Sequence, residues 1–248
     1  MNWTITGITK KGRENFKLWH KGEITRFRSW EHCYFTFAKY RKQKEKGKRL
    51  TGEDFDCLSL HLAFYLASWG MYRGSCFILH KDYKIHRRAV EILFERDYKD
   101  LWAINGGSYF EDENKIDTVI GLSNRLKDYY EPTRSNVYKY LGKNNDAPDK
   151  NVSDTLITKI LLGTLGCVPA YDRFFTTGVK NVGVASGTFS AKSIFALSEY
   201  YAKKYDDFEK LITFVYEKQR TKYPPMRILD MCFWQIGWEL EKDREEWE

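Results

Sequence analysis

The chain has 248 residues, of which 42% are hydrophobic and 30% charged, and its formal net charge is +7. Such a chain can bury its own core as one large domain or two small ones, without support from a metal or a disulfide. No apolar stretch reaches the roughly 18 residues that a membrane span requires, and the first residues lack the features of a signal peptide. We therefore expect a soluble, cytoplasmic protein that does not associate with membranes.

The cysteines argue against a disulfide framework or a zinc site. There are five, an odd number, and no two form a CxxC pair. We interpret them as reduced core residues in a reducing compartment. The sequence also lacks the glycine-rich phosphate-binding loops, the H-E-x-x-H pattern and the G-x-S-x-G pattern. No cofactor and no metal ion are therefore expected.

Positive charge is concentrated near the start of the chain. Residues 1–50 hold 14 Lys and Arg against four Asp and Glu, whereas residues 239–248 hold six acids and two bases. A basic segment attracts phosphate-rich partners, and salt weakens that attraction. The alternative interpretation is a solvated helix face that keeps the protein soluble.

The hydrophobic periodicity predicts an all-α fold, a compact globule of about eight or nine helices. Residues 3–9 alternate weakly, which favours a short strand, but no strand series follows. The helices are expected at 30–45, 51–69, 83–102, 116–132, 154–165, 169–177, 190–205, 207–216 and 229–240. Thr51, Asp154 and Ser190 are the expected N-terminal caps of three of them.

Three features of this pattern bear on the core and on a site. Residues 58–69 are apolar nearly all round, so we expect this helix at the centre of the core. Gly70 and Gly74 follow it and predict a bend or a close backbone approach. Pro132 is expected to end the helix in which it lies.

Residues 142–151 form the best candidate for a linker, because they are polar and contain Pro148. A boundary there gives a basic N-terminal lobe, 1–141, and a C-terminal lobe, 152–248. A single domain is the alternative.

Arg73 and His80 form the first candidate site. Arg73 follows a buried helix, so its charge must be paired or face a cleft. The spacing of Arg73 and His80 resembles the R-x4–6-H motif of HEPN ribonucleases, which are all-helical dimers. The resemblance implies that both side chains act on the 2′-hydroxyl and phosphate of RNA without a metal. Alternatively, Arg73 bridges helix carbonyls or a carboxylate, and His80 lies on a partly buried face.

Asp172 is the second candidate. Residues 155–178 contain a helix, a turn with Pro169, and an aspartate that opens the next helix. This arrangement resembles part of the helix-hairpin-helix DNA-glycosylase superfamily. The resemblance implies that Asp172 stabilises a developing sugar cation or activates a nucleophile. Alternatively, Asp172 is an acid favoured by a helix N-terminus, and a pairing with Arg73 would join both candidates in one cleft.

Aromatic residues alternate with bases in the N-terminal segment, around 16–21 and 26–30. Bases attract a nucleic-acid backbone and rings stack on exposed nucleobases. An amphipathic packing edge with extended cations is the alternative. The predicted nucleic-acid contacts are Lys10, Lys11, Arg13, Lys17, Trp19, Arg26, Arg28, Trp30, Arg41 and Lys42.

Together these features predict a nucleic-acid-associated helical protein that binds DNA or RNA through its basic N-terminal segment. A DNA-glycosylase-like scaffold with a cleft near Arg73 and Asp172 is the first form of this hypothesis. A HEPN-like, metal-independent ribonuclease toxin is the second. The third is a non-catalytic interaction module with a protein partner or a second copy of itself. Whether the protein is an enzyme stays open.

Overall fold

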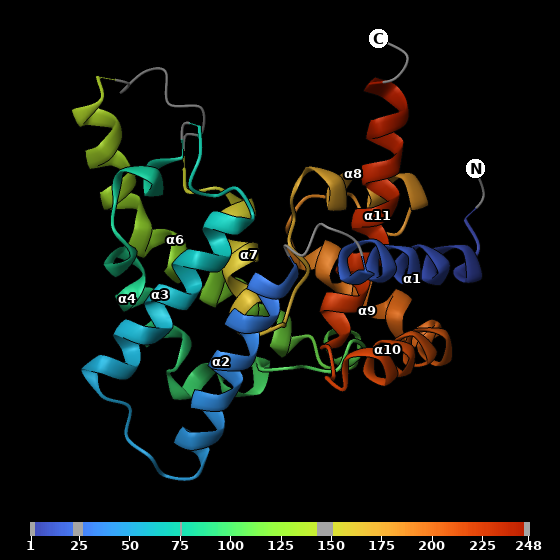
Figure 1. Cartoon of the computed structure of the whole chain (residues 1–248), viewed down its shortest axis with the longest axis horizontal. Helices are drawn as coiled ribbons and strands as arrows, with labels where there is room; N and C mark the ends of the chain where they lie inside the picture. The colour runs from blue at the N-terminus through green and yellow to red at the C-terminus, as the bar shows by residue number, and fades with distance from the viewer. Residues whose placement is uncertain (1–2, 22–26, 75, 143–150, 246–248) are drawn as a thin grey trace. The chain divides into compact units, whose positions relative to one another are not determined.

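The computed structural model describes residues 3–21, 27–74, 76–142 and 151–245, without the side chains of 19–21 and 243–245 (Figure 1). These residues form eleven α-helices and three short 3-10 helices, with no strand. The α-helices are α1 Ile5–Lys21, α2 Phe27–Glu45, α3 Gly52–Ser68, α4 Arg87–Leu93, α5 Ser108–Glu111, α6 Asn114–Tyr140, α7 Asp154–Thr164, α8 Arg173–Val182, α9 Ala191–Lys203, α10 Tyr205–Gln219 and α11 Pro225–Glu245. The 3-10 helices are η1 Phe77–His80, η2 Tyr83–His86 and η3 Arg96–Leu101.

The all-α prediction is confirmed, but the helices outnumber the eight or nine expected. The strand predicted at residues 3–9 is wrong, because α1 covers most of that range. Ile8 and Phe16 lie two turns apart and are both buried, as helical periodicity requires. Packing of this helix face outweighs the weak alternation of the first residues.

The helix predicted over 83–102 is also wrong, because that stretch is divided into η2, α4 and η3. Two cations of α2 account for the end of α4. Arg41 donates to the carbonyl oxygen of Leu93, and Lys44 donates to that of Phe94. The last carbonyls of a helix lack partners within it. These cations satisfy two of them where α4 stops.

Pro132 does not end its helix, contrary to the sequence prediction, and α6 continues to Tyr140. A proline inside a helix removes one hydrogen bond and costs about 3 kcal/mol. Beyond it, Arg134, Val137 and Tyr138 are all buried. Burial of these side chains offsets the loss, so the helix persists.

The chain forms two compact units, each built from separate segments. Unit 1 comprises residues 1–25, 101–120 and 166–248, and unit 2 comprises 26–100 and 121–165. The predicted lobes, 1–141 and 152–248, stay a prediction. Residues 143–150, most of the expected linker, lie outside the described residues.

Unit 1 is organised around the crossing of α8 and α11. A Cβ atom added at Gly178 would lie 1.9 Å from the carbonyl oxygen of Phe233, and one added at Gly237 would lie 1.8 Å from that of Phe174. Only glycine permits two backbones to approach so closely. On another face of α11, Asn15 of α1 donates to the Gln235 side chain at 3.2 Å.

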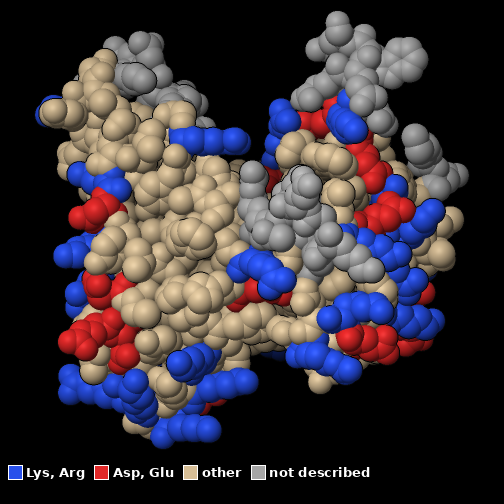
Figure 2. Space-filling view, viewed as in Figure 1, with Lys and Arg blue, Asp and Glu red and all other residues tan. Residues whose placement is uncertain are grey.

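Unit 2 is organised around α7, which is buried along its length from Leu156 to Thr164. The helix expected at the centre, now α3, instead exposes Leu60 (54%) and Phe64 (60%) on its outer face. Figure 2 shows an extensive surface without charged side chains on unit 2. The side chain of Trp30, from α2, donates to the carbonyl oxygen of Leu162 at 3.2 Å.

The burial of the cysteines and the hydropathy of the helices can be compared with the sequence predictions. Cys33, Cys167 and Cys232 are buried, as predicted, whereas Cys57 and Cys76 are half-buried. No helix in the described ranges is both long enough and apolar enough to cross a bilayer.

Gly163 provides a test of the packing in unit 2. A Cβ there would lie 2.3 Å from the buried Tyr65 ring, whereas a Cβ at the exposed Gly121 of α6 meets nothing within 4 Å. We expect Gly163→Ala to lower the free energy of unfolding by about 1–3 kcal/mol. The matched control, Gly121→Ala, should raise it by about 0.4–1 kcal/mol. Urea unfolding measures both, and equal effects would contradict the close approach of α7 to α3.

Candidate functional site

The candidate site begins at the turn after α3. Thr51 caps the start of this helix in a capping box with Asp54, as predicted, and Trp69 caps its end. Gly70 follows with φ +77° and Gly74 with φ +60°. Both values lie in the left-handed region that favours glycine. The bend predicted from the two glycines is therefore confirmed.

Arg73 lies in this turn with its guanidinium folded back over Gly70. A Cβ atom at Gly70 would be 2.9 Å from Nε of Arg73, so the glycine also makes room for that side chain. Arg73 is exposed, and its guanidinium makes no hydrogen bond or ion pair with the residues that the structure describes. The alternative in which Arg73 bridges carbonyls or a carboxylate is thus not observed in that part of the chain.

Arg134 of α6 supplies a second guanidinium, which is only 8% exposed. Its Nε donates to both carboxylate oxygens of Glu131, at 2.9 and 3.0 Å. The same carboxylate accepts the backbone N–H of Val152 at 3.2 Å. The hydrogen bond from Arg134 lowers the pKa of Glu131. These contacts fasten the segment before α7 to α6 and hold Arg134 in place.

These elements enclose a pocket of about 330 Å³ in unit 2. Arg73 and Arg134 line it, together with Tyr138 and with Ser153 at the start of α7. The Ser153 hydroxyl accepts the N–H of Leu156 at 3.3 Å and caps α7. No Asp or Glu is among the described lining residues. The Arg73 guanidinium and the N-terminus of α7, with no acid among the described lining residues, favour an anionic ligand such as a phosphate group.

Two buried side chains, Lys159 and His86, bond to residues at the end of α3 and in the turn that follows it. Lys159 of α7 is 6% exposed and donates to the carbonyl oxygen of Trp69 at 3.0 Å, which places a cation at the C-terminal end of α3. His86 bonds to the hydroxyl of Tyr72 at 2.8 Å and to that of Tyr130 at 2.7 Å. Burial lowers the pKa of His86 to about 3, so its ring is neutral near pH 7.

The three predicted catalytic residues are not all in this pocket. Arg73 lines it, but His80 is exposed at the end of η1 and is not among the described lining residues. Asp172 belongs to unit 1, where its carboxylate caps α8 by accepting the N–H of Phe175 at 3.1 Å. Its position at the start of α8 matches the alternative of an acid favoured by a helix N-terminus. Catalysis by any of the three stays a prediction.

The carboxylate of Asp230 lies near Asp172 in unit 1. Asp230 pairs with Arg227, and it accepts the N–H of Ala170 at 3.0 Å. Burial, with a contribution from the charge of Asp172, raises the pKa of Asp230 to about 6. Asp230 thereby ties the segment that contains Pro169 to α11, a structural task for this carboxylate.

The predicted nucleic-acid contacts fall on both units. Those on α1 belong to unit 1, where Lys11 pairs with Glu14 and Glu239, both at 2.7 Å. On α2, Trp30 is fully buried and Arg41 is 6% exposed, so these two predictions need correction: both side chains serve internal packing. The rest comprise the exposed residues Lys10, Arg13, Lys17, Arg28 and Lys42, with Arg26 and the side chain of Trp19 outside the described residues.

Sequence reasoning did not find Arg134 or the capping role of Ser153. The sequence predicts that this helix ends at Pro132 and therefore does not place Arg134 on it. Asp154 was expected to cap the next helix, but the cap is its neighbour Ser153, and Asp154 pairs with Lys127 at 2.6 Å. The signal for Ser153 was present, since serine is among the preferred capping residues.

Among the described residues, no group of three or more His, Cys, Asp or Glu side chains could hold a metal ion. Comparisons with protein-family models, curated proteins and solved structures found no match to this chain.

The buried His86 predicts a pH dependence of stability. Its pKa is about 3 in the folded protein, against 6.5 for an ordinary histidine, so below pH 6.5 the unfolded state binds more protons than the folded state. Between pH 7 and pH 5 this group should lower the free energy of unfolding by roughly 1–2 kcal/mol. We expect the difference in stability between wild type and His86→Gln to shrink accordingly in urea titrations. Parallel curves at both pH values would contradict the neutral, buried ring.

Proposed function

We propose that unit 2 binds the phosphate backbone of a nucleic acid, and that the pocket beside Arg73 receives one phosphate group. The observation that carries this proposal is the distribution of charge. Unit 2 contains 23 Lys and Arg against 15 Asp and Glu, whereas unit 1 contains 18 against 19. Such an excess attracts polyanions over a distance of about one Debye length, roughly 8 Å at physiological salt.

Part of this excess is available at the surface. Lys39, Lys42, Lys46 and Arg49 are exposed at the end of α2, and none makes an ion pair within the described part of the chain. Figure 2 shows Lys and Arg side chains gathered at this end of unit 2. Cations that no acid neutralises are the ones that release counterions from a nucleic acid on binding.

The pocket adds directed hydrogen bonds to this general attraction. The Arg73 guanidinium makes no internal bond in the described residues, so it can donate to a phosphate without breaking one. The guanidinium of Arg134 already donates hydrogen bonds to Glu131, so Arg73 is the residue that supplies the donors for a phosphate. Guanidinium groups match the geometry of phosphate oxygens.

Cleavage of the bound nucleic acid is a separate hypothesis. The resemblance to HEPN ribonucleases implies strand cleavage, and the resemblance to helix-hairpin-helix DNA glycosylases implies removal of a base. The contacts around Arg73 support binding, and no observation adds a second catalytic group to the pocket. Gel analysis of the oligonucleotides recovered from the binding experiment below would reveal strand cleavage, and alkali treatment of the recovered DNA before the gel would reveal base removal.

The salt dependence of binding tests the proposal. The probes are fluorescein-labelled single-stranded RNA and duplex DNA, followed by anisotropy. Replacing Lys39, Lys42, Lys46 and Arg49 by Gln should weaken binding and reduce the slope of log K against log salt by up to about 3, since each phosphate contact contributes about 0.7–0.9.

The matched control removes the same charge from unit 1. Lys204, Lys210, Lys218 and Lys222 are also exposed, and their replacement by Gln should leave the slope almost unchanged. Equal slopes for the two quadruple variants would contradict a binding surface on unit 2. Affinity that does not fall as salt rises would contradict electrostatic binding altogether.

A further inference from the structure

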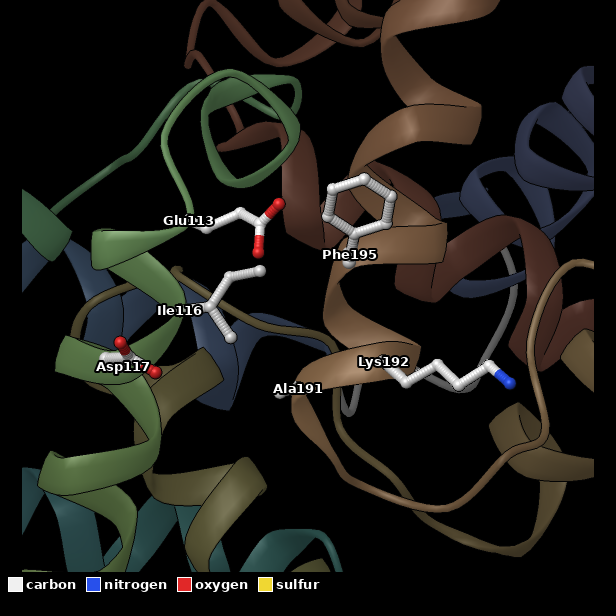
Figure 3. A pocket seen from close by; sticks show the side chains of 6 residues that line it. All are labelled: Glu113, Ile116, Asp117, Ala191, Lys192 and Phe195. Atoms are coloured by element: carbon white, nitrogen blue, oxygen red, sulfur yellow. The ribbon is translucent and has the colours of Figure 1, made fainter.

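A second pocket, of about 370 Å³, lies in unit 1 between the start of α6 and the start of α9 (Figure 3). Its apolar lining comes from Ile116 of α6 and from Ala191 and Phe195 of α9. Its charged lining comes from Glu113 and Asp117, with Lys192 on the opposite side. In Figure 3 the Lys192 side chain extends away from the two acids. The pocket therefore combines an apolar wall with an acidic one.

Glu113 and Asp117 are one helical turn apart, and both are exposed. Neither carboxylate makes a hydrogen bond or an ion pair in the described part of the chain. Two like charges at this spacing repel one another. A cation between them would relieve the repulsion.

Capping of α6 does not explain these acids. The carboxylate of Asp112 already performs that task, because it accepts the N–H of Asn114 at 3.2 Å. Asp112 also pairs with Lys115 at 3.7 Å. Within the described residues, the carboxylates of Glu113 and Asp117 thus bond to no other group and remain available to a ligand.

The apolar wall is aromatic and partly open to solvent. The Phe195 ring meets that of Phe110 edge-on, with centroids 5.4 Å apart, and Phe110 is 39% exposed. Figure 3 shows the Glu113 side chain extending from the turn before α6 toward the Phe195 ring on α9. An aromatic ring beside a carboxylate suits a guanidinium, which can stack on the ring and donate two parallel hydrogen bonds to the acid.

We propose that this pocket binds an arginine side chain in a basic segment of a partner protein. Charge complementarity selects this occupant, since residues 111–117 contain four acids and one base. Arginine is favoured over lysine because the ammonium group has neither the flat face nor the fork of donors. The site is in unit 1 and does not depend on polyanion binding by unit 2.

The test uses two fluorescein-labelled peptides that alternate alanine with either arginine or lysine, followed by anisotropy with the full chain. Wild type should bind the arginine peptide several-fold more tightly than the lysine peptide of equal charge. Glu113→Gln with Asp117→Asn should weaken arginine-peptide binding about tenfold, as expected for lost charge-assisted hydrogen bonds. The control, Asp206→Asn with Glu217→Gln, removes the same charge from exposed positions of α10 and should change binding less than about twofold.

Phe195→Leu separates stacking from charge. It should bring the affinities for the two peptides close together while the lysine peptide still binds, and thermal unfolding verifies that this variant is folded. Should Phe195→Leu fail to fold, the two pairs of acid variants still decide the question, because all four acids are exposed. Equal binding of both peptides by wild type, equal weakening by both pairs, or no binding at all would overturn the proposal.

Discussion

The close approach of α7 to α3 at Gly163 is the constraint on which the candidate site depends. There the Tyr65 ring of α3 packs directly against the backbone of α7, in the space that a Cβ at Gly163 would need. The C-terminal end of α3 carries the Gly70–Gly74 turn, and the N-terminal end of α7 carries Ser153. The hydrogen bond from Lys159 of α7 to the Trp69 carbonyl oxygen also holds α7 against the end of α3. The pocket follows from this packing.

Several cations of unit 2 bond to carbonyl oxygens inside the fold, and others are exposed at its surface. Arg41 and Lys44 satisfy carbonyls at the end of α4, and Lys159 satisfies one at the end of α3. Each of these cations takes the place that a helix C-terminus favours. What is left is a smaller, exposed set around the end of α2, together with Arg73. The total charge of unit 2 therefore overestimates the number of cations that a nucleic acid can contact. The exposed cations are the ones that count.

Several local signals in the sequence predicted local features correctly. Thr51 and Ser190 cap helices as expected, and Gly70 and Gly74 adopt the left-handed turn that their spacing indicated. Each of these features depends on a few neighbouring residues. The helical class of the fold was predictable for the same reason, since periodicity is read within one segment at a time.

Features that depend on distant residues were not predictable in this way. Arg134 lines the pocket because α6 continues past Pro132. The helix continues because its last residues are buried against other elements, and the sequence of this one segment does not show that burial. The interruption of the predicted helix at 83–102 depends on cations some 50 residues away. The composition of α3 indicated a buried helix, yet Leu60 and Phe64 are exposed. Packing decides which helix lies at the centre of unit 2, and α7, with Gly163 against the Tyr65 ring, is the helix that is buried along its length.

The most direct test of the account is whether the pocket binds phosphate through Arg73. Thermal unfolding is measured with inorganic phosphate against sodium chloride at equal ionic strength, for wild type, Arg73→Ala and Arg96→Ala. Arg96 is an exposed arginine of unit 2 that is not among the described residues lining the pocket. A ligand raises the stability of the state to which it binds. The account predicts that phosphate raises the unfolding midpoint of wild type and Arg96→Ala but not of Arg73→Ala. An equal rise in all three proteins, or none in wild type, would contradict it.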